Sequence, residues 1–189
     1  LGGYSESGIS GDKTESNMGS YTYDYWVVKI SATGIIEWQN TIGGSGYDYL
    51  QSIKQTTDGG YILGGYSYSG ISGDKTEAAK GESDYWILKL STTGTIEWQN
   101  TIGGSGYEQL EAIQQTTDSG YILGGYSSSD ISGDKTEANQ GYDYWVVKLS
   151  DINTNPPLAQ FTAPIATFLY APTTFTNTTT DYINTPNAG

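Results

Sequence analysis

A tandem repeat with a period of about 60 residues runs through most of this chain. The motif GGYS begins at Gly2, Gly64 and Gly124, and the motifs ISGDKTE and DYW follow it in the same order each time. Only the segment between ISGDKTE and DYW changes in length, from SNMGSYTY to AAKGES to ANQGY. Because insertions are tolerated in exposed loops and not in packed elements, this segment is predicted to be a surface loop.

Within one repeat, four runs have the residue pattern of β-strands. These runs span residues 50–57, 60–67, 84–90 and 95–102. Asp58-Gly59 predicts a two-residue hairpin turn between the first two runs. Gly94 suits the left-handed position of a type I turn with a G1 bulge between the last two. Two hairpins per repeat predict a four-stranded antiparallel sheet.

The third run, DYWILKL, is largely apolar on both of its faces. Trp86, Leu88 and Leu90 share one face, and Tyr85 and Ile87 lie on the other, because successive side chains of a strand point to opposite sides. Each side of the sheet is therefore expected to meet another layer. Sheets that are stacked or arranged radially meet this requirement.

Composition excludes several classes of partner and chemistry. The 189 residues include 8 Lys and Arg against 21 Asp and Glu, and the net charge of -13 argues against binding to nucleic acid. With no Cys and no His, disulfides, thiolate zinc sites and the commonest general base are excluded. The sequence contains no run of about 18 apolar residues, so no membrane insertion is predicted. A cation held by carboxylate and carbonyl oxygens is still compatible with the sequence.

The repeat resembles two kinds of β-propeller sequence. The segment KLSTTGTIEW resembles the tryptophan-docking motif of quinoprotein-type propellers, in which a Gly turn precedes a Trp that packs against the next blade. The whole unit resembles the long repeats of secreted, multidomain surface proteins of the Bacteroidota. This resemblance covers roughly residues 1–150 and implies an all-β, β-propeller-like array of four-stranded antiparallel blades.

The resemblance also implies a location and a set of packing residues. It implies secretion, commonly by the type IX route, and an extracellular or cell-surface location. Each tryptophan would pack between blades. These residues are Trp26, Trp38, Trp86, Trp98 and Trp145.

The repeats in this chain do not close a ring by themselves. The chain enters at the second strand of one blade and leaves the third repeat after residues 143–150, whereas propellers need about four to eight blades. We expect that Leu1 is not the native start and that the remainder of the same large polypeptide, or neighbouring chains, completes the blades. The last blade would take its outer strand from an upstream region. The alternative is a β-solenoid, in which repeats stack linearly.

The composition changes after Ser150. Residues 151–157, with the sequence DINTNPP, have the character of a linker. In residues 158–189, LAQFTA and APTTFTNTTT resemble the first two strands of a PKD domain, which is an immunoglobulin-like sandwich. Since a whole sandwich takes about 100 residues, we expect the beginning of such a domain or a hairpin appended to the repeats.

The repeated heptapeptide offers candidate ligands for calcium. These are Asp12, Glu15, Asp74, Glu77, Asp134 and Glu137. Calcium loops of the EF-hand type use several carboxylates at alternate positions, whereas here Lys75 follows Asp74 directly and would repel a cation. The interpretation we favour is an Asp-capped turn in which Gly73 supplies a permissive backbone. No other cofactor is predicted.

The expected function is non-catalytic. Glu37 and Glu97 recur in the IEW motifs, and a position that recurs in every repeat is typical of structure and not of an active site. We predict no catalytic residue and expect an adhesion or interaction module of a larger secreted protein, with a protein or a glycan as partner. The alternatives are a structural fibre or stalk and a glycan-binding surface, since tyrosine rings stack on sugars.

Ligand contacts are expected in the variable loops more than in the heptapeptide. The candidate residues there are Tyr21, Tyr23, Lys80, Glu82, Asn139 and Tyr142.

Overall fold

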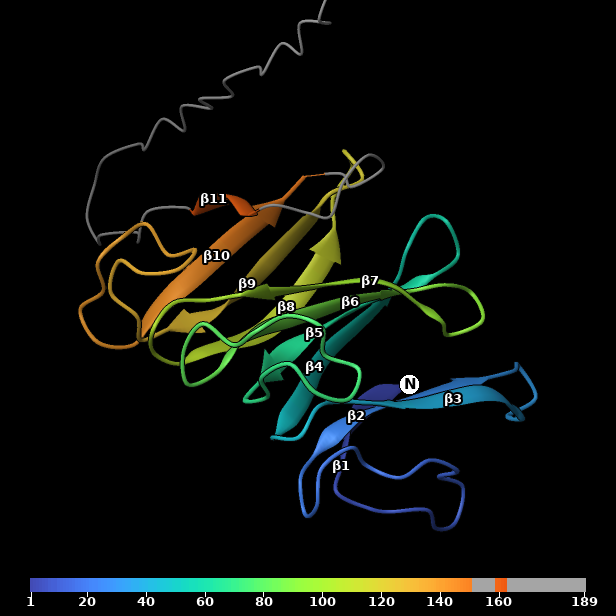
Figure 1. Ribbon diagram of the computed structural model, residues 1–189. Coiled ribbons are helices and arrows are strands. Elements are labelled where there is room, and N and C mark those ends of the chain that lie inside the picture. The colour runs from blue at the N-terminus through green and yellow to red at the C-terminus, as the bar shows by residue number, and fades with distance from the viewer. Residues whose placement is uncertain (151–158, 163–189) are drawn as a thin grey trace, which may run out of the picture.

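The computed structural model describes residues 1–150 and 159–162, which form three antiparallel β-sheets (Figure 1). The first sheet has the order β1-β2-β3, with β1 (Gly2–Ser5), β2 (Asp24–Ile30) and β3 (Ile36–Ile42). The second has the order β4-β5-β6-β7, with β4 (Asp48–Gln55), β5 (Tyr61–Ser67), β6 (Asp84–Leu90) and β7 (Ile96–Ile102). The third has the order β11-β10-β9-β8, with β8 (Glu108–Gln115), β9 (Tyr121–Ser127), β10 (Asp143–Leu149) and β11 (Ala159–Thr162).

The predicted all-β class is confirmed. The described part of the chain contains no helix of the length and apolarity needed to cross a membrane. Each sheet with its loops is called a unit below: unit 1 is residues 1–46, unit 2 is residues 47–106 and unit 3 is residues 107–150.

The three units share one strand register. Gly64 of β5 lies opposite Ile87 of β6, and the pairs Gly2 with Val27 and Gly124 with Val146 occupy the same position in units 1 and 3. Strands β4 and β8, which begin units 2 and 3, are bulged at the same place, between Leu50 and Ser52 in β4 and between Leu110 and Ala112 in β8. Equal sequence patterns therefore produce equal sheets.

The turn between β4 and β5 differs from the predicted two-residue turn. Thr56 donates to the Gly60 carbonyl at 2.9 Å, and Gly59 donates back to the Thr56 carbonyl at 2.9 Å, so residues 57–59 form the loop. Gly59 takes the left-handed position with φ of 84°. The Asp58 carboxylate accepts the Gly60 N–H at 3.0 Å. Asp-Gly suits this longer turn as well as the shorter one, because both place glycine at positive φ.

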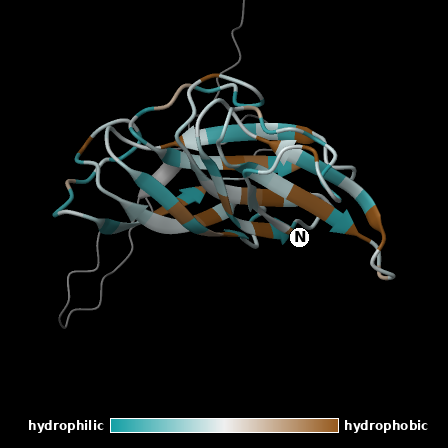
Figure 2. Cartoon of the chain, turned by 90° about the horizontal axis from the view of Figure 1, so that it is seen from below, coloured by the Kyte–Doolittle hydropathy of each residue, from teal (hydrophilic) through white to brown (hydrophobic). Residues whose placement is uncertain are grey.

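Both faces of β6 are buried, as its sequence predicts. Trp86, Leu88 and Leu90 pack with Tyr25 and Val27 of unit 1. On the opposite face of β6, its other apolar side chains form a second core with residues of unit 3. That second core includes Tyr85, Ile87, Leu110, Trp145, Val147 and Leu149. In Figure 2, brown hydrophobic segments lie on the strands, and most of the loops are white or teal.

A pair of aromatic residues marks each seam between units. The Tyr25 hydroxyl donates to the Trp86 carbonyl oxygen at 3.1 Å, and their rings lie 5.1 Å apart. Tyr85 and Trp145 repeat this contact with the same distances. The equivalent Tyr144 of unit 3 is 87% exposed. Among the described residues, no further unit thus covers the face of unit 3 that is buried in units 1 and 2.

Trp38 of β3 docks on the turn between β6 and β7 of the next unit. Its indole N–H donates to the Thr92 carbonyl at 3.1 Å, and the Asn40 amide donates to the Gly94 carbonyl at 2.5 Å. Gly94 has φ of 87°, as the predicted turn requires, and a Cβ added there would lie 3.0 Å from the Trp38 ring. Trp98 of β7 reaches the following unit in a similar way, since its ring lies 5.7 Å from that of Tyr121.

The remaining tryptophan, Trp26, bonds within its own sheet. Its indole N–H donates to the Gln39 side chain at 3.0 Å, as Trp86 donates to Gln99 at 3.1 Å. Four tryptophans therefore make seam contacts, and two, Trp26 and Trp86, bond to a glutamine on β3 or β7 of their own unit.

Strand β11 pairs with the outer edge of β10. We expected an upstream segment at this edge, but a sheet edge offers unpaired backbone groups to any extended chain, and here the downstream residues 159–162 occupy it. These residues belong to the segment expected to start a PKD-like domain or an appended hairpin. Residues 151–158 and 163–189, with the expected linker and the rest of that segment, lie outside the described residues.

Candidate functional site

The heptapeptide ISGDKTE forms a tight hairpin in all three units. Ser72 and Lys75 exchange two backbone hydrogen bonds of 2.9 and 3.1 Å, and Gly73, the first residue between them, has φ of 54°. Ser10 with Lys13 and Ser132 with Lys135 form the same bridge. A two-residue hairpin with glycine first is the arrangement of a type II′ turn. The constant glycine therefore has a backbone role.

The aspartate of this turn clamps the preceding unit. The Asp74 N–H donates to the Gly43 carbonyl at 2.8 Å, and the Gly43 N–H donates to the Asp74 carboxylate at 3.2 Å. Asp134 forms the same two bonds with Gly103, at 2.8 and 3.0 Å. Asp12 is exposed, since unit 1 has no unit before it among the described residues.

The glutamate of the turn points to its own sheet. Glu77 accepts the Thr101 N–H at 2.5 Å, and Glu15 accepts the Thr41 N–H at 2.5 Å. Between the two acids, the Lys75 ammonium is buried 5.7 Å from the centre of the Trp86 ring, and burial lowers its pKa.

The acids predicted as calcium ligands within one heptapeptide thus reach different partners. Glu137 shares its turn with Lys135, which donates to the Glu137 carbonyl at 2.7 Å. Across the described residues, no three carboxylates converge in a group that could hold a metal ion.

Residues of the variable loops are distributed over several surfaces. Tyr21 is 94% exposed and has positive φ, and Tyr142 packs its ring 5.9 Å from Tyr126. The Glu82 N–H donates to the Gly106 carbonyl at 2.9 Å, and the Asn139 amide donates to Gly141 at 2.8 Å. The predicted loop residues therefore do not form one site, although Tyr23 and Lys80 each lie in an arrangement described below.

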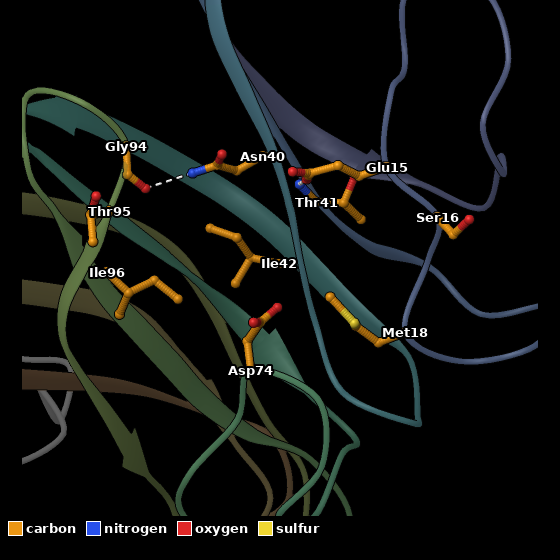
Figure 3. Close-up of a pocket in the computed structure, with 10 residues that line it drawn as sticks. All are labelled: Glu15, Ser16, Met18, Asn40, Thr41, Ile42, Asp74, Gly94, Thr95 and Ile96. Atoms are coloured by element: carbon orange, nitrogen blue, oxygen red, sulfur yellow. Dashed lines mark hydrogen bonds between the residues drawn. The ribbon is translucent and has the colours of Figure 1, made fainter.

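A groove of about 520 Å³ lies at the seam between units 1 and 2 (Figure 3). One wall comes from the start of the variable loop of unit 1 and from β3, and the other from the turns of unit 2. Its lining residues are Glu15, Ser16, Met18, Asn40, Thr41, Ile42, Asp74, Gly94, Thr95 and Ile96. Sequence reasoning missed this groove because its two walls belong to different repeats.

Two carboxylates give the groove a negative charge. Glu15 comes from unit 1 and Asp74 from unit 2, so each heptapeptide contributes one acid to the same space. Burial, followed by the nearby charge of Glu15, raises the pKa of the Asp74 carboxyl. A cation close to such a carboxyl group stabilises its charged form.

A connected cluster of tyrosines extends over all three units. Its members, called the tyrosine cluster below, are Tyr4, Tyr23, Tyr47, Tyr49, Tyr66, Tyr68 and Tyr107. Tyr49 lies 4.9 Å from the Tyr4 ring and 5.0 Å from the Tyr66 ring. Tyr47 and Tyr49 are nearly parallel, with 12° between their planes. Four of the seven tyrosines are exposed and the other three are half-buried, so the cluster presents an aromatic surface with several hydroxyl groups.

Buried acid pairs lie at the same seams. Asp24 and Asp48 are fully buried at the first seam, and Asp84 and Glu108 are fully buried at the second. A Cβ added at Gly103 would lie within 2.8 Å of both Asp84 Oδ1 and Glu108 Oε2, so these two carboxylates converge. The pKa of Asp24 is raised to about 6, chiefly by burial and in addition by the charge of Asp48.

The two acids considered for catalysis are exposed and paired. Glu37 lies 2.9 Å from the Lys29 ammonium, and Glu97 lies 3.0 Å from the Lys89 ammonium. Each pair links neighbouring strands on the surface of a sheet.

The sequence matches no family model and no curated protein.

Proposed function

We propose that this chain is a non-catalytic interaction module of a larger protein displayed outside the cell, built as part of a β-propeller-type array. The resemblance of its repeats to secreted surface proteins supports the location. The recurrence of one seam geometry supports a modular array, because Tyr25–Trp86 and Tyr85–Trp145 place successive units in the same way.

The arrangement of the units favours a propeller over a solenoid. Strands β4 and β8 approach each other. Strand β4 also contacts β1 of unit 1, and β8 also contacts β5 of unit 2. Strands farther from β4 and β8 spread apart, so the three sheets fan out (Figure 1). Blades that converge on one side and diverge on the other are the geometry of a propeller.

The tyrosine cluster is the observation that carries a binding function. It continues from Tyr4 of unit 1 to Tyr107 of unit 3, so the surface depends on the stacking of units and not on one loop. Tyrosine is enriched at protein interfaces because its ring buries a large area at a low entropic cost and its hydroxyl keeps a polar contact.

The same cluster favours a neutral glycan as a specific second candidate. Nearly parallel rings such as Tyr47 and Tyr49 offer flat faces to a pyranose ring. The Tyr66 hydroxyl, like that of an ordinary tyrosine, is protonated at neutral pH and can donate to a sugar oxygen, and burial raises its pKa to about 12. Because Glu6 raises the pKa of Tyr23 and the net charge is -13, an acidic sugar would be repelled.

Substitution of exposed cluster residues tests this function. The chain would be titrated with neutral gluco-, manno- and xylo-hexaoses, and its adhesion to beads coated with polysaccharide or with extracellular protein would be measured. The double change Tyr47→Ala with Tyr68→Ala is expected to weaken any binding about tenfold. Tyr144→Ala is the control, since this exposed residue lies outside the cluster. Equal binding by both variants on every surface would contradict the proposal.

The rival function is a structural fibre or stalk of linearly stacked units. Small-angle scattering distinguishes the two, because a fanned array of three units is compact and a fibre element is elongated or forms polymers. A scattering profile that grows longer with protein concentration would favour the fibre.

A further inference from the structure

The two seams of the molecule differ at one equivalent position. The Met18 N–H donates to the Asp24 carboxylate at 2.6 Å, and the Lys80 N–H donates to the Asp84 carboxylate at 2.9 Å. The variable loop therefore starts in the same way in units 1 and 2. A methionine at the first seam replaces a lysine at the second.

At the second seam, the lysine spans the two units. The Lys80 ammonium forms an ion pair with Asp134 of unit 3 and donates to the Thr101 carbonyl of unit 2 at 2.8 Å. The ion pair is about one-third exposed on each side. Lys80 thus neutralises the aspartate that clamps units 2 and 3 together.

At the first seam, the equivalent aspartate has no such lysine. The Asp74 carboxylate accepts the Gly43 N–H. The Met18 side chain runs past the neighbouring Gly73, and its Cγ would lie 3.1 Å from a Cβ added to that glycine. Met18 is 46% exposed in the groove (Figure 3). A carboxylate can accept about four hydrogen bonds, so Asp74 retains acceptor capacity.

A hydroxyl group beside this groove is buried and has no partner among the described residues. Thr41 is 4% exposed, and its hydroxyl oxygen has no hydrogen-bond partner among the described residues. In unit 2, the equivalent Thr101 hydroxyl accepts from Lys75. In unit 1, Lys13 turns instead to the Asn17 side chain at 2.9 Å. The Thr41 hydroxyl therefore lacks the lysine donor that its equivalent in unit 2 has.

We propose that the groove between units 1 and 2 binds a primary ammonium group, such as the end of a lysine side chain of a partner protein. The acceptors would be the Asp74 carboxylate and the Thr41 carbonyl oxygen, which are the equivalents of the two groups that Lys80 contacts at the second seam. Ile42 and Ile96 supply apolar walls for the methylene stem of a lysine. Glu15 adds a second negative charge.

An ammonium group fits this groove better than a divalent metal does. Calcium takes six to eight oxygen ligands and usually several carboxylates. Here Glu15 and Asp74 are the two carboxylates among the residues that line the groove, and Glu15 also accepts the Thr41 N–H. The second seam supplies the chemical precedent, because a lysine ammonium binds the equivalent acceptors there.

Chemical-shift titration of the full chain tests the proposal. The probes are n-butylammonium, the peptide acetyl-Gly-Lys-Gly-amide, the matched norleucine peptide and calcium chloride. Both amines are expected to shift the amide signals of Thr41 and Asp74 saturably, and the norleucine peptide is expected to leave them in place. Tighter binding of the lysine peptide than of butylammonium indicates a protein lysine as the ligand, and equal binding indicates a free amine.

Three variants map the site. Met18→Lys is expected to abolish binding, because its own ammonium fills the groove, and Asp74→Asn is expected to weaken binding about fivefold. Lys80→Met is expected to create a second site, with shifts at Thr101 and Asp134 and a stoichiometry of two. Equal shifts with the lysine and norleucine peptides, unchanged binding by Met18→Lys, or a response to calcium but to neither amine would overturn the proposal. The groove shares no residue with the tyrosine cluster, so the outcome is independent of the proposed interaction surface.

Discussion

The Tyr25 hydroxyl donates a 3.1 Å hydrogen bond to the backbone carbonyl of Trp86, across the seam between two repeats. Tyr85 and Trp145 form the same bond at the next seam. Both tyrosines are fully buried, so each bond also satisfies a polar group that water does not reach. The contact thus couples the orientation of one sheet to the backbone of the next.

Removal of this hydroxyl is expected to destabilise the protein. Tyr85→Phe should lower the free energy of unfolding by about 1 kcal/mol, because it removes the buried hydrogen bond to the Trp145 carbonyl. Urea denaturation measures the change. Tyr144→Phe is the matched control and should have no effect, since Tyr144 is exposed. Equal losses in the two variants would show that the hydroxyl does not act through the seam.

The glycine at the centre of β5 or β9 is expected to be required only where a following unit packs against that strand. A Cβ at Gly64 would lie 2.6 Å from Leu110 Cδ2 and 3.1 Å from Ile113 Cγ2, whereas no atom lies within 4 Å at Gly124. Gly64→Val should therefore cost about 1–3 kcal/mol by overpacking, and Gly124→Val should change stability by less than about 0.5 kcal/mol. Thermal unfolding compares them. A comparable loss in Gly124→Val would contradict the open face of unit 3.

The residue at the start of the variable loop is expected to tune the strength of each seam. Met18→Lys would give Asp74 the partner that Asp134 already has, and it should stabilise the protein by about 0.5 kcal/mol. Lys80→Met should destabilise it by a similar amount. Urea denaturation at low salt and at 1 M salt measures both effects, which should shrink at high salt because the ion pair is partly exposed. A gain in Met18→Lys that is insensitive to salt would point to packing instead.

Strand order and sheet packing could be predicted because they depend on patterns within one repeat. The two apolar faces of DYWILKL led to layers on both sides, and Trp86 and Tyr85 do lie in separate cores. The turn role of ISGDKTE followed from Gly73 and Asp74, although the bond from Asp74 to the preceding unit could not be read from one copy. The turn at Asp58-Gly59 was wrong in length because one dipeptide suits two loop geometries.

The groove could not be predicted because its walls come from different repeats. Glu15 and Asp74 come together only when the stacking of units is known, and sequence reasoning grouped each acid with its own heptapeptide. One signal was present in the sequence, since the equivalent loop positions carry Met18, Lys80 and Gln140 in an otherwise constant setting. A change of charge at one repeated position is therefore a marker for a seam that differs from the others.

Buried carboxyls are expected to make the protein more stable in mild acid. The pKa of Asp24 is raised to about 6, first by burial and then by the charges of Asp48 and Asp74, although the Met18 N–H and the charge of Lys13 oppose the shift. The folded state therefore holds its proton more tightly than the unfolded state, in which the pKa is about 4. The contribution to stability is complete below pH 4 and is lost as the pH rises to about 6.

Urea midpoints at pH 4.5 and 6.5 measure this dependence. The native chain should lose about 1–2 kcal/mol between the two values. Asp24→Asn should lose less, because an amide keeps the bond from the Met18 N–H without a charge, and the remaining dependence would come from Asp48 and Asp84, whose pKa values are raised by burial. Asp12→Asn, at the exposed first turn, is the control and should retain the native slope. A native chain that is more stable at pH 6.5 than at pH 4.5 would exclude a protonated carboxyl at the seam.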